Sequence, residues 1–239
     1  PSEPRCPGNE SWCGVSGKTS DSDFEDTQVT ARALALLANL TAAGADSGPG
    51  RGAEPAPWFL AVGYRKPHLQ WRVPSSFIDE IPADTVTLPK HKTFPAKAPP
   101  IAFHQPVNDF LKPFADVERC GGASVMSPNS SFPDSCQLKW RRGYHASVSF
   151  MDSQVGKLLD ALEQHQVENT TVVVFFGDHG WNLGEAAEWE KFTNLELSAR
   201  VPLIMKAPAL KRSAERGESS VVVHDLVELV DVMPTIIDL

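Results

Sequence analysis

The sequence predicts an α/β fold, in which a mixed and mostly parallel sheet is flanked by helices. Two apolar runs without alternation, 58–64 and 171–176, are typical of strands that are buried on both faces. Two longer segments, 26–43 and 139–165, carry apolar residues at helical spacing. Helical and strand-like segments follow one another along the chain, which is the order found in α/β domains.

The first part of the chain is expected to be a loop followed by a helix. Residues 1–25 are rich in Ser, Gly, Pro, Asp and Glu, which favours irregular structure. The helical spacing then begins near residue 26, where Asp26 or Thr27 could cap the helix. A Gly, Pro and Ala linker over 44–57 separates this helix from the next element.

The apolar run 58–64 is the first predicted strand, and polar groups follow it at once. Arg65, Lys66, Pro67 and His68 stand where the strand would end. In open α/β sheets this edge holds the ligands. A solvated loop and a functional site are both open interpretations of Lys66 and His68.

A proline-rich segment, 65–138, follows and is too long for a plain connection within a compact domain. We expect it to form a surface excursion that walls a cleft, with a stapled insertion between Cys120 and Cys136. It also contains a small basic cluster, for which a solvated face is the simpler interpretation. The basic cluster consists of Lys90, His91, Lys92 and Lys97.

The carboxyl-terminal half returns to regular structure. Pro202 predicts that the strand expected at 201–205 either lies at the edge of a sheet or begins at this residue. Pro234 should kink or restart the last helix. The elements expected here are a helix at 139–165, strands at 171–176 and 201–205, and an amphipathic helix at 225–239.

Composition narrows the class of function. The net charge is −8, and this argues against a nucleic-acid-binding protein, whose phosphate contacts need clustered Lys and Arg. A local basic pocket for an anionic substrate stays compatible with this charge. No apolar stretch approaches the roughly 18–20 residues of a membrane span. Because the chain starts at Pro1 and stops inside a predicted helix, we expect a piece of a longer protein.

The cysteines and glycosylation sequons favour a secretory or lysosomal protein. The four cysteines could form two local pairs, Cys6–Cys13 and Cys120–Cys136, although four cysteines allow three connectivities. Disulfides are rare in the cytosol. The N-x-S/T sequons lie at Asn9, Asn39, Asn129 and Asn169.

The pair Asp178-His179 follows the second apolar run directly. A buried carboxylate there would need a cation or several hydrogen bonds, and a divalent metal supplies both charge and coordination. Gly177 and Gly180 flank the pair and let the backbone bend tightly around it. The simpler interpretation is a turn in which Asp178 caps the next segment and His179 lies on the surface.

Five segments in the same order resemble the type I sulfatases of the alkaline phosphatase-like superfamily. The resemblance implies a sulfatase fold, with residues 26–239 as the carboxyl-side part of the catalytic domain. The segments are 59–68, 144–159, 177–191, 200–204 and 225–235.

The resemblance also implies a function, namely hydrolysis of sulfate esters with one divalent metal, Ca²⁺. The expected substrate is the 2-O-sulfate on uronic acid residues of sulfated glycosaminoglycans. In this family Asp178 and His179 would be metal ligands. Lys66, His68 and Lys191 would bind the substrate, and His68 and Lys191 would also act in catalysis.

This chain departs from the family pattern in three places. The family nucleophile is a formylglycine made from the Cys of C-x-P-S-R, and no cysteine here stands in that motif. We therefore expect the nucleophile upstream of Pro1 and no activity from this chain alone. Ala186-Ala187 stands where close relatives usually have His-Gly, and the Cys120–Cys136 insertion has no obvious counterpart.

Two other functions stay open. The first is a phosphonate or phosphate-ester hydrolase of the same metal-hydrolase superfamily. The second is a relative without catalysis that kept the fold and binds sulfated sugar. The nucleophile discriminates among the three, because C-x-P-S-R favours a sulfatase, Thr or Ser favours phosphoryl transfer, and a missing nucleophile favours binding alone.

Overall fold

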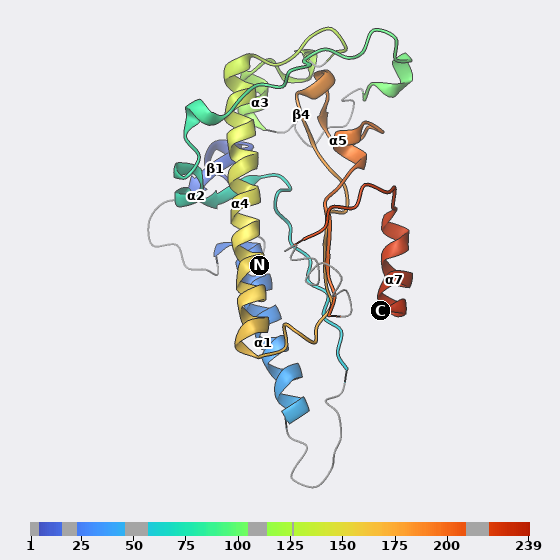
Figure 1. Ribbon diagram of the computed structural model, residues 1–239. Coiled ribbons are helices and arrows are strands. Elements are labelled where there is room, and N and C mark those ends of the chain that lie inside the picture. Colours follow the sequence, from blue (N-terminus) through green and yellow to red (C-terminus); the bar gives the residue numbers. More distant parts are fainter. Residues whose placement is uncertain (1–4, 16–22, 46–56, 105–113, 126, 209–219) are drawn as a thin grey trace.

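The fold is organised around one long helix, α4, which runs from Asp134 to Gln164 (Figure 1). The computed structural model describes residues 5–15, 23–45, 57–104, 114–125, 127–208 and 220–239. Helix α1, Glu25–Ala45, packs along one end of α4. Both long helices confirm the helical spacing in the sequence. α4 begins earlier than residue 139, because Pro133 precedes it and fixes a backbone angle that suits a helix start.

The middle of α4 packs against a small parallel sheet. Strands β1, Trp12–Val15, and β2, Trp71–Pro74, pair in parallel, with Trp12 opposite Trp71. The short helix α2, Ser75–Asp79, packs beside them. The prediction of a loop over residues 1–25 is therefore wrong at β1. The disulfide Cys6–Cys13, one of the two predicted pairs, ties the segment before β1 to the strand.

The segment before the Asp178-His179 pair forms a second sheet. Strand β3, Val173–Phe176, pairs antiparallel with β6, Leu203–Lys206. The expectation of a strand buried on both faces is wrong for this segment, because Phe176 is 47% exposed and Ile204 is 62% exposed. β6 starts directly after Pro202, as that residue predicted.

Residues 58–64 are not a strand, which corrects the prediction for this run. They are extended, with half-buried and exposed side chains in alternation, and Phe59 is 73% exposed. Among the described residues no neighbouring strand forms a ladder with them. Apolar and aromatic composition therefore identified a segment suited to a sheet, but a strand also needs a hydrogen-bonded partner.

The proline-rich excursion is built from short helical segments held by the second disulfide. Cys120–Cys136 joins the end of α3, Ala115–Arg119, to the start of α4, and this confirms the second predicted pair. Within the excursion, short turns of 3₁₀-helix lie at Ala83–Thr85, Pro100–Ala102 and Gly122–Val125. Two further 3₁₀ turns outside it lie at Pro7–Asn9 and Glu185–Ala187.

Aromatic side chains form the core between α4 and the β4–β5 hairpin. β4, Asn182–Leu183, pairs antiparallel with β5, Trp189–Glu190. The rings of Trp140 and Trp189 meet edge to face, with centroids 5.2 Å apart. Such pairs contribute about 0.5–1.5 kcal/mol beyond their buried area. The hairpin is thus fixed to the buried face of α4 at Trp140.

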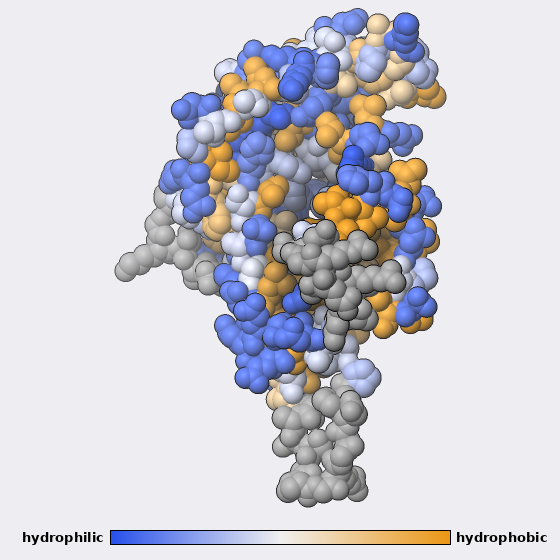
Figure 2. Space-filling model, viewed as in Figure 1, coloured by the Kyte–Doolittle hydropathy of each residue, from blue (hydrophilic) through white to orange (hydrophobic). Residues whose placement is uncertain are grey.

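The chain closes with a shorter helix than the sequence predicted. A 3₁₀ turn, Leu229–Asp231, leads into α7, Val232–Asp238, and residues 225–228 are not helical. Glu228 and Asp231 cap this start reciprocally. Pro234 lies in the first turn of α7, where it restarts the helix as expected. Apolar surface appears over α7 and beside the β3–β6 pair (Figure 2). None of the described helices is long and apolar enough to cross a membrane.

Candidate active site

Asp178 and His179 lie in the turn that follows β3, as the sequence predicted, but Asp178 is not buried. Its side chain is 85% exposed, whereas that of His179 is 35% exposed. The Asp178 Oδ1 atom accepts the backbone N–H of His179 at 2.9 Å, and its Oδ2 atom lies 3.4 Å from His179 Nε2. The carboxylate and the imidazole therefore face the same point in space.

Gly180 allows this turn to pass close to the segment that contains α5, Glu196–Ala199. Its N–H donates to the Ser198 carbonyl oxygen at 2.8 Å. A β-carbon at residue 180 would overlap the Leu197 carbonyl. Only glycine fits here, and the position of His179 depends on this close approach.

The β4–β5 hairpin returns the chain to the same place and delivers Lys191. Asn182 pairs with Glu190, so Lys191 comes back beside the residues that precede β4. Its Nζ atom lies 2.9 Å from His179 Nε2. His179 Nδ1 lies 2.9 Å from the Gly180 carbonyl oxygen, which can only accept a hydrogen bond. Nδ1 therefore carries the ring hydrogen, and Nε2 accepts a hydrogen bond from the Lys191 ammonium.

The loop 65–68 brings the second predicted group of residues to this site. Asp26, in the first turn of α1, accepts the backbone N–H of Arg65 at 2.7 Å and of Lys66 at 3.0 Å. The sequence predicted Asp26 or Thr27 as the helix cap, and neither has this role, because α1 already begins at Glu25. Both oxygens of Asp26 instead hold the loop. Trp71 Nε1 donates to the Pro67 carbonyl oxygen at 2.8 Å and fixes the other side.

Lys66 and His68 have different environments within that loop. Lys66 is 5% exposed, and its Nζ atom donates to the Gln70 carbonyl oxygen at 2.9 Å. His68 Nδ1 lies 2.8 Å from the Leu69 carbonyl oxygen, and its ring stands edge-on to Trp181 at 6.3 Å. Nδ1 is thus the donor, and His68 takes up its second proton at Nε2.

Positive charge converges on His68. Burial lowers the pKa of His68, and the charges of Arg65, Lys191 and Lys66 lower it further. Three of the predicted residues, Asp178, His179 and Lys191, lie in contact. His68 reaches the same segment through the ring of Trp181, whereas the Lys66 ammonium is turned to the Gln70 carbonyl oxygen.

Asp178 and His179 fit part of a divalent-cation site. Two oxygen or nitrogen ligands of Ca²⁺ at right angles stand about 3.4 Å apart, because each bond is about 2.4 Å long. The separation of Asp178 Oδ2 and His179 Nε2 matches this value. Ca²⁺ prefers oxygen ligands, so the carboxylate fits by chemistry and the imidazole by position alone.

The cation site is incomplete in two further respects. Ca²⁺ takes six to eight ligands, and the described residues contain no group of three His, Cys, Asp or Glu side chains placed to hold an ion. The Nε2 lone pair of His179 also accepts from Lys191, so coordination through this atom requires the ammonium to turn aside.

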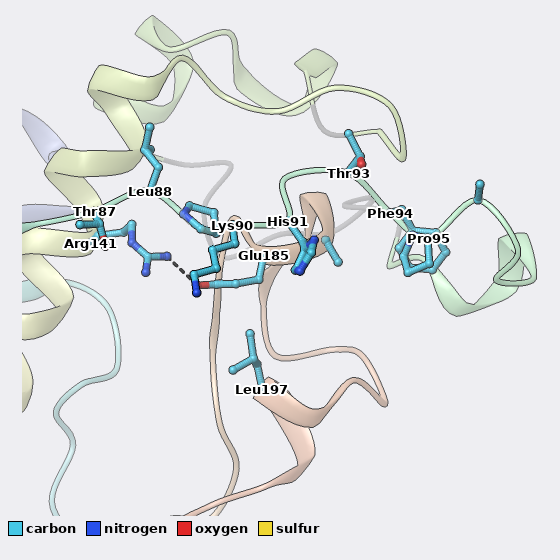
Figure 3. Close-up of a pocket in the computed structure, with 13 residues that line it drawn as sticks. Thr87, Leu88, Lys90, His91, Thr93, Phe94, Pro95, Arg141, Glu185 and Leu197 are labelled. Atoms are coloured by element: carbon cyan, nitrogen blue, oxygen red, sulfur yellow. Dashed lines mark hydrogen bonds and ion pairs between the residues drawn. The ribbon is translucent and has the colours of Figure 1, made fainter.

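A cavity of about 820 Å³ lies between the excursion and the 3₁₀ turn 185–187 (Figure 3). Leu197 lines it, and the Leu197 carbonyl packs on Gly180 in the turn after β3. Arg141, Glu185 and Lys90 also line the cavity. Arg141 Nη1 donates to Glu185 Oε1 at 2.6 Å and to the Leu183 carbonyl oxygen at 2.9 Å. Sequence reasoning missed Arg141, because it stands within helical spacing and belongs to no catalytic motif. The expected cleft beside the excursion is present.

Comparison with known proteins identifies the family. The sulfatase family model matches residues 22–239. The chain belongs to the sulfatase family. It is 34% identical to human iduronate 2-sulfatase over 235 residues, which is 88% of this chain and 39% of that protein. The segments that predicted the family also resemble iduronate 2-sulfatase, and this alignment confirms the resemblance. This sulfatase chain spans about two fifths of the relative it matches.

Solved structures share the fold of this sulfatase chain. The phosphonate monoester hydrolase of Silicibacter pomeroyi has a TM-score of 0.63 and 24% identity, and the match covers 92% of this chain and 38% of that one. BT4656, solved in complex with its substrate D-glucosamine-2-N,6-O-disulfate, has a TM-score of 0.52 and 20% identity, with 78% and 43% covered. Both matches show the alkaline phosphatase-like α/β fold, which confirms the predicted fold class. Within the described residues, however, the strands form one parallel pair and two antiparallel pairs and not one mostly parallel sheet.

Proposed function

We propose that the protein containing this chain hydrolyses sulfate esters, and that this chain supplies the sulfate-binding and cation-binding side of the active site. The contact between Lys191 and His179 carries the proposal. It joins the exposed Asp178 carboxylate, suited to a cation, to a group of cationic side chains, suited to an anion. A sulfate ester bound to a divalent metal presents both partners.

Each residue has a distinct role in this proposal. Lys191 Nζ neutralises a sulfate oxygen, since it contacts His179 directly. His68 Nε2 donates a proton to the alcohol oxygen that leaves, which is the task of a general acid. Lys66 adds positive charge behind His68 while its ammonium stays on the Gln70 carbonyl oxygen. Asp178 and His179 hold the divalent metal, proposed as Ca²⁺.

The anion itself should prepare His68 for proton donation. The free site lowers the pKa of His68 through burial and three cationic neighbours. A bound sulfate group brings negative charge beside the same ring and shifts this pKa upward. Substrate binding is therefore coupled to proton uptake, and proton donation should be favoured in an acidic compartment.

A metal bound here would stabilise negative charge on the sulfate oxygens as a Lewis acid. The nucleophile is proposed to be a formylglycine in sequence outside this chain. All four cysteines here are in disulfides. Without the nucleophile and the remaining ligands, this chain alone is expected to be inactive.

The proposed substrate is the 2-O-sulfate of a uronic acid residue in a sulfated glycosaminoglycan, supported by the 34% identity to iduronate 2-sulfatase. Degradation of such chains in the lysosome, or secretion, fits the two disulfides. Glycosylation is compatible with exposed sequon residues at Asn39, Asn129 and Asn169.

A phosphonate or phosphate-ester hydrolase is the second candidate, because a phosphonate monoester hydrolase shares the fold. A relative that only binds sulfated sugar is the third. The test compares the full-length protein on 4-nitrophenyl sulfate and 4-nitrophenyl phenylphosphonate, which release the same alcohol. We expect faster release from the sulfate. Faster release from the phosphonate would favour the second candidate, and release from neither would favour the third.

A further inference from the structure

The cavity between the excursion and the 3₁₀ turn 185–187 is lined by groups that the proposed sulfate site does not include. Three kinds of group meet there: the cationic Lys90, the Arg141–Glu185 ion pair and an apolar wall that includes Leu88 and Leu197 (Figure 3). The volume of about 820 Å³ is within the range of small-molecule sites. None of these residues belongs to the group around Lys191.

We propose that this cavity is a subsite for a neighbouring acidic sugar unit of the substrate, with Lys90 binding its carboxylate or sulfate. This inference rests on the proposed function, because it assigns a binding site to the sugar unit next to the reacting sulfated residue of the glycosaminoglycan. The reacting ester would lie at Lys191, and the adjoining unit would lie across the 3₁₀ turn Glu185–Ala187.

The charges of the cavity support an acidic sugar. Glu185 is neutralised by Arg141 at 2.6 Å and also accepts the Leu183 N–H at 2.7 Å. Lys90 then remains as a positive charge that an anionic group can meet. The ion pair is largely buried, with side chains 13% and 26% exposed, so it forms a fixed polar wall.

Arg141 retains hydrogen-bonding capacity at this wall. Only its Nη1 atom has partners among the described residues, and its buried Nε atom finds no acceptor there. A guanidinium has five N–H donors. Donors without partners are costly, and a sugar hydroxyl or carboxylate oxygen in the cavity would supply acceptors for guanidinium N–H groups that have no protein partner.

The cavity is connected to the reacting site through backbone contacts. Leu197 lines the cavity, and its carbonyl packs directly on Gly180, the neighbour of His179. On the opposite side, the Ala186 N–H donates to the His91 carbonyl oxygen at 2.7 Å, which ties the excursion to the hairpin. Ala186 contributes only a methyl group, so room for a sugar ring remains.

The experiment measures binding of two probes to the chain. One is a uronate monosaccharide 2-sulfate, and the other is a heparin-derived tetrasaccharide that carries the same terminal unit. The gain in affinity, which is the ratio of the tetrasaccharide affinity to the monosaccharide affinity, measures how much the subsite contributes to binding. We expect Lys90→Ala to lower this gain about fivefold, the upper range for an exposed ion pair. Lys90→Arg should retain most of it.

Lys97→Ala is the matched control, because Lys97 is an exposed lysine of the same excursion that does not line the cavity. It should change the gain less than twofold. If both variants lower the gain in affinity equally, the subsite is overturned in favour of a solvated basic face. The subsite is also overturned if Lys90→Ala leaves the gain in affinity unchanged. Lys191→Ala tests the proposed function separately. It should weaken binding of the monosaccharide and leave the gain in affinity for the tetrasaccharide unchanged.

Discussion

At the scale of single residues, the carboxyl of Glu188 couples stability to pH. Its side chain is 1% exposed, and Oε1 accepts the His104 N–H at 2.9 Å. Burial raises the pKa of Glu188 from 4.5 to about 7, although that hydrogen bond acts in the opposite sense. The folded protein therefore binds a proton over a pH range in which the unfolded chain has lost it.

Because the folded-state pKa is the higher one, stability should fall as pH rises from about 4.5 to 7. The effect is at most about 3 kcal/mol, since each pKa unit is worth about 1.4 kcal/mol. Glu188→Gln keeps the acceptor and should remove this dependence. Urea denaturation at pH 5 and pH 8 measures it, with the exposed Glu163→Gln as control. The same slope in Glu188→Gln and wild type would refute the assignment.

Ala186 is held in a left-handed backbone conformation, with φ of 53°. An L-residue with a β-carbon pays about 1 kcal/mol for this conformation, whereas glycine does not. Ala186→Gly should therefore raise the free energy of unfolding by about 1 kcal/mol. Ala199→Gly, in helix α5, should lower it instead. A destabilised Ala186→Gly variant, measured by thermal unfolding, would contradict this interpretation.

At the scale of elements, the turn after β3 depends on its contact with α5. Gly180→Ala forces a methyl group into the Leu197 carbonyl, and we expect a loss of about 2 kcal/mol or more, or a displaced turn. Gly156→Ala is the control, because a β-carbon there meets nothing within 4 Å and alanine favours a helix. Chemical shifts of the His179 ring would reveal displacement. An unchanged ring environment and stability would contradict the account.

The sequence predicted elements whose stability is local and missed those that depend on distant partners. Helices α1 and α4 follow from their own apolar spacing. The ladder of β1 with β2 joins residues far apart in the chain, so no local pattern predicts it. The apolar run 58–64 shows the converse, since its composition suits a strand but no described strand pairs with it.

The candidate site divides in the same way. Asp178, His179, Lys191, Lys66 and His68 were predicted from motifs, and the first three lie in contact in the structure. Asp26 and Arg141 were missed as parts of the site, because their importance arises from contacts across the fold. Asp26 supports the 65–68 loop through two backbone N–H groups, and Arg141 reaches Glu185 across the helix–hairpin contact.

At the scale of the whole molecule, α4 is the scaffold on which the two halves of the site are assembled. The hairpin that carries Lys191 packs on its aromatic face. The loop that carries His68 leads into β2, which also packs on α4. On the β3–β6 pair, Phe176 and Ile204 are exposed on opposite faces. Under the proposed function, the chain as described forms one wall of the active site.

The most direct test is release of inorganic sulfate from a 2-O-sulfated uronate disaccharide by the full-length protein and its Asp178→Ala variant. Calcium is kept saturating, and both proteins are first shown to be equally folded. We expect Asp178→Ala to lower kcat/KM by about 10²–10³-fold, as for loss of one group that stabilises transition-state charge. Full activity in the variant would contradict the central claim that this turn holds the metal side of a sulfatase site.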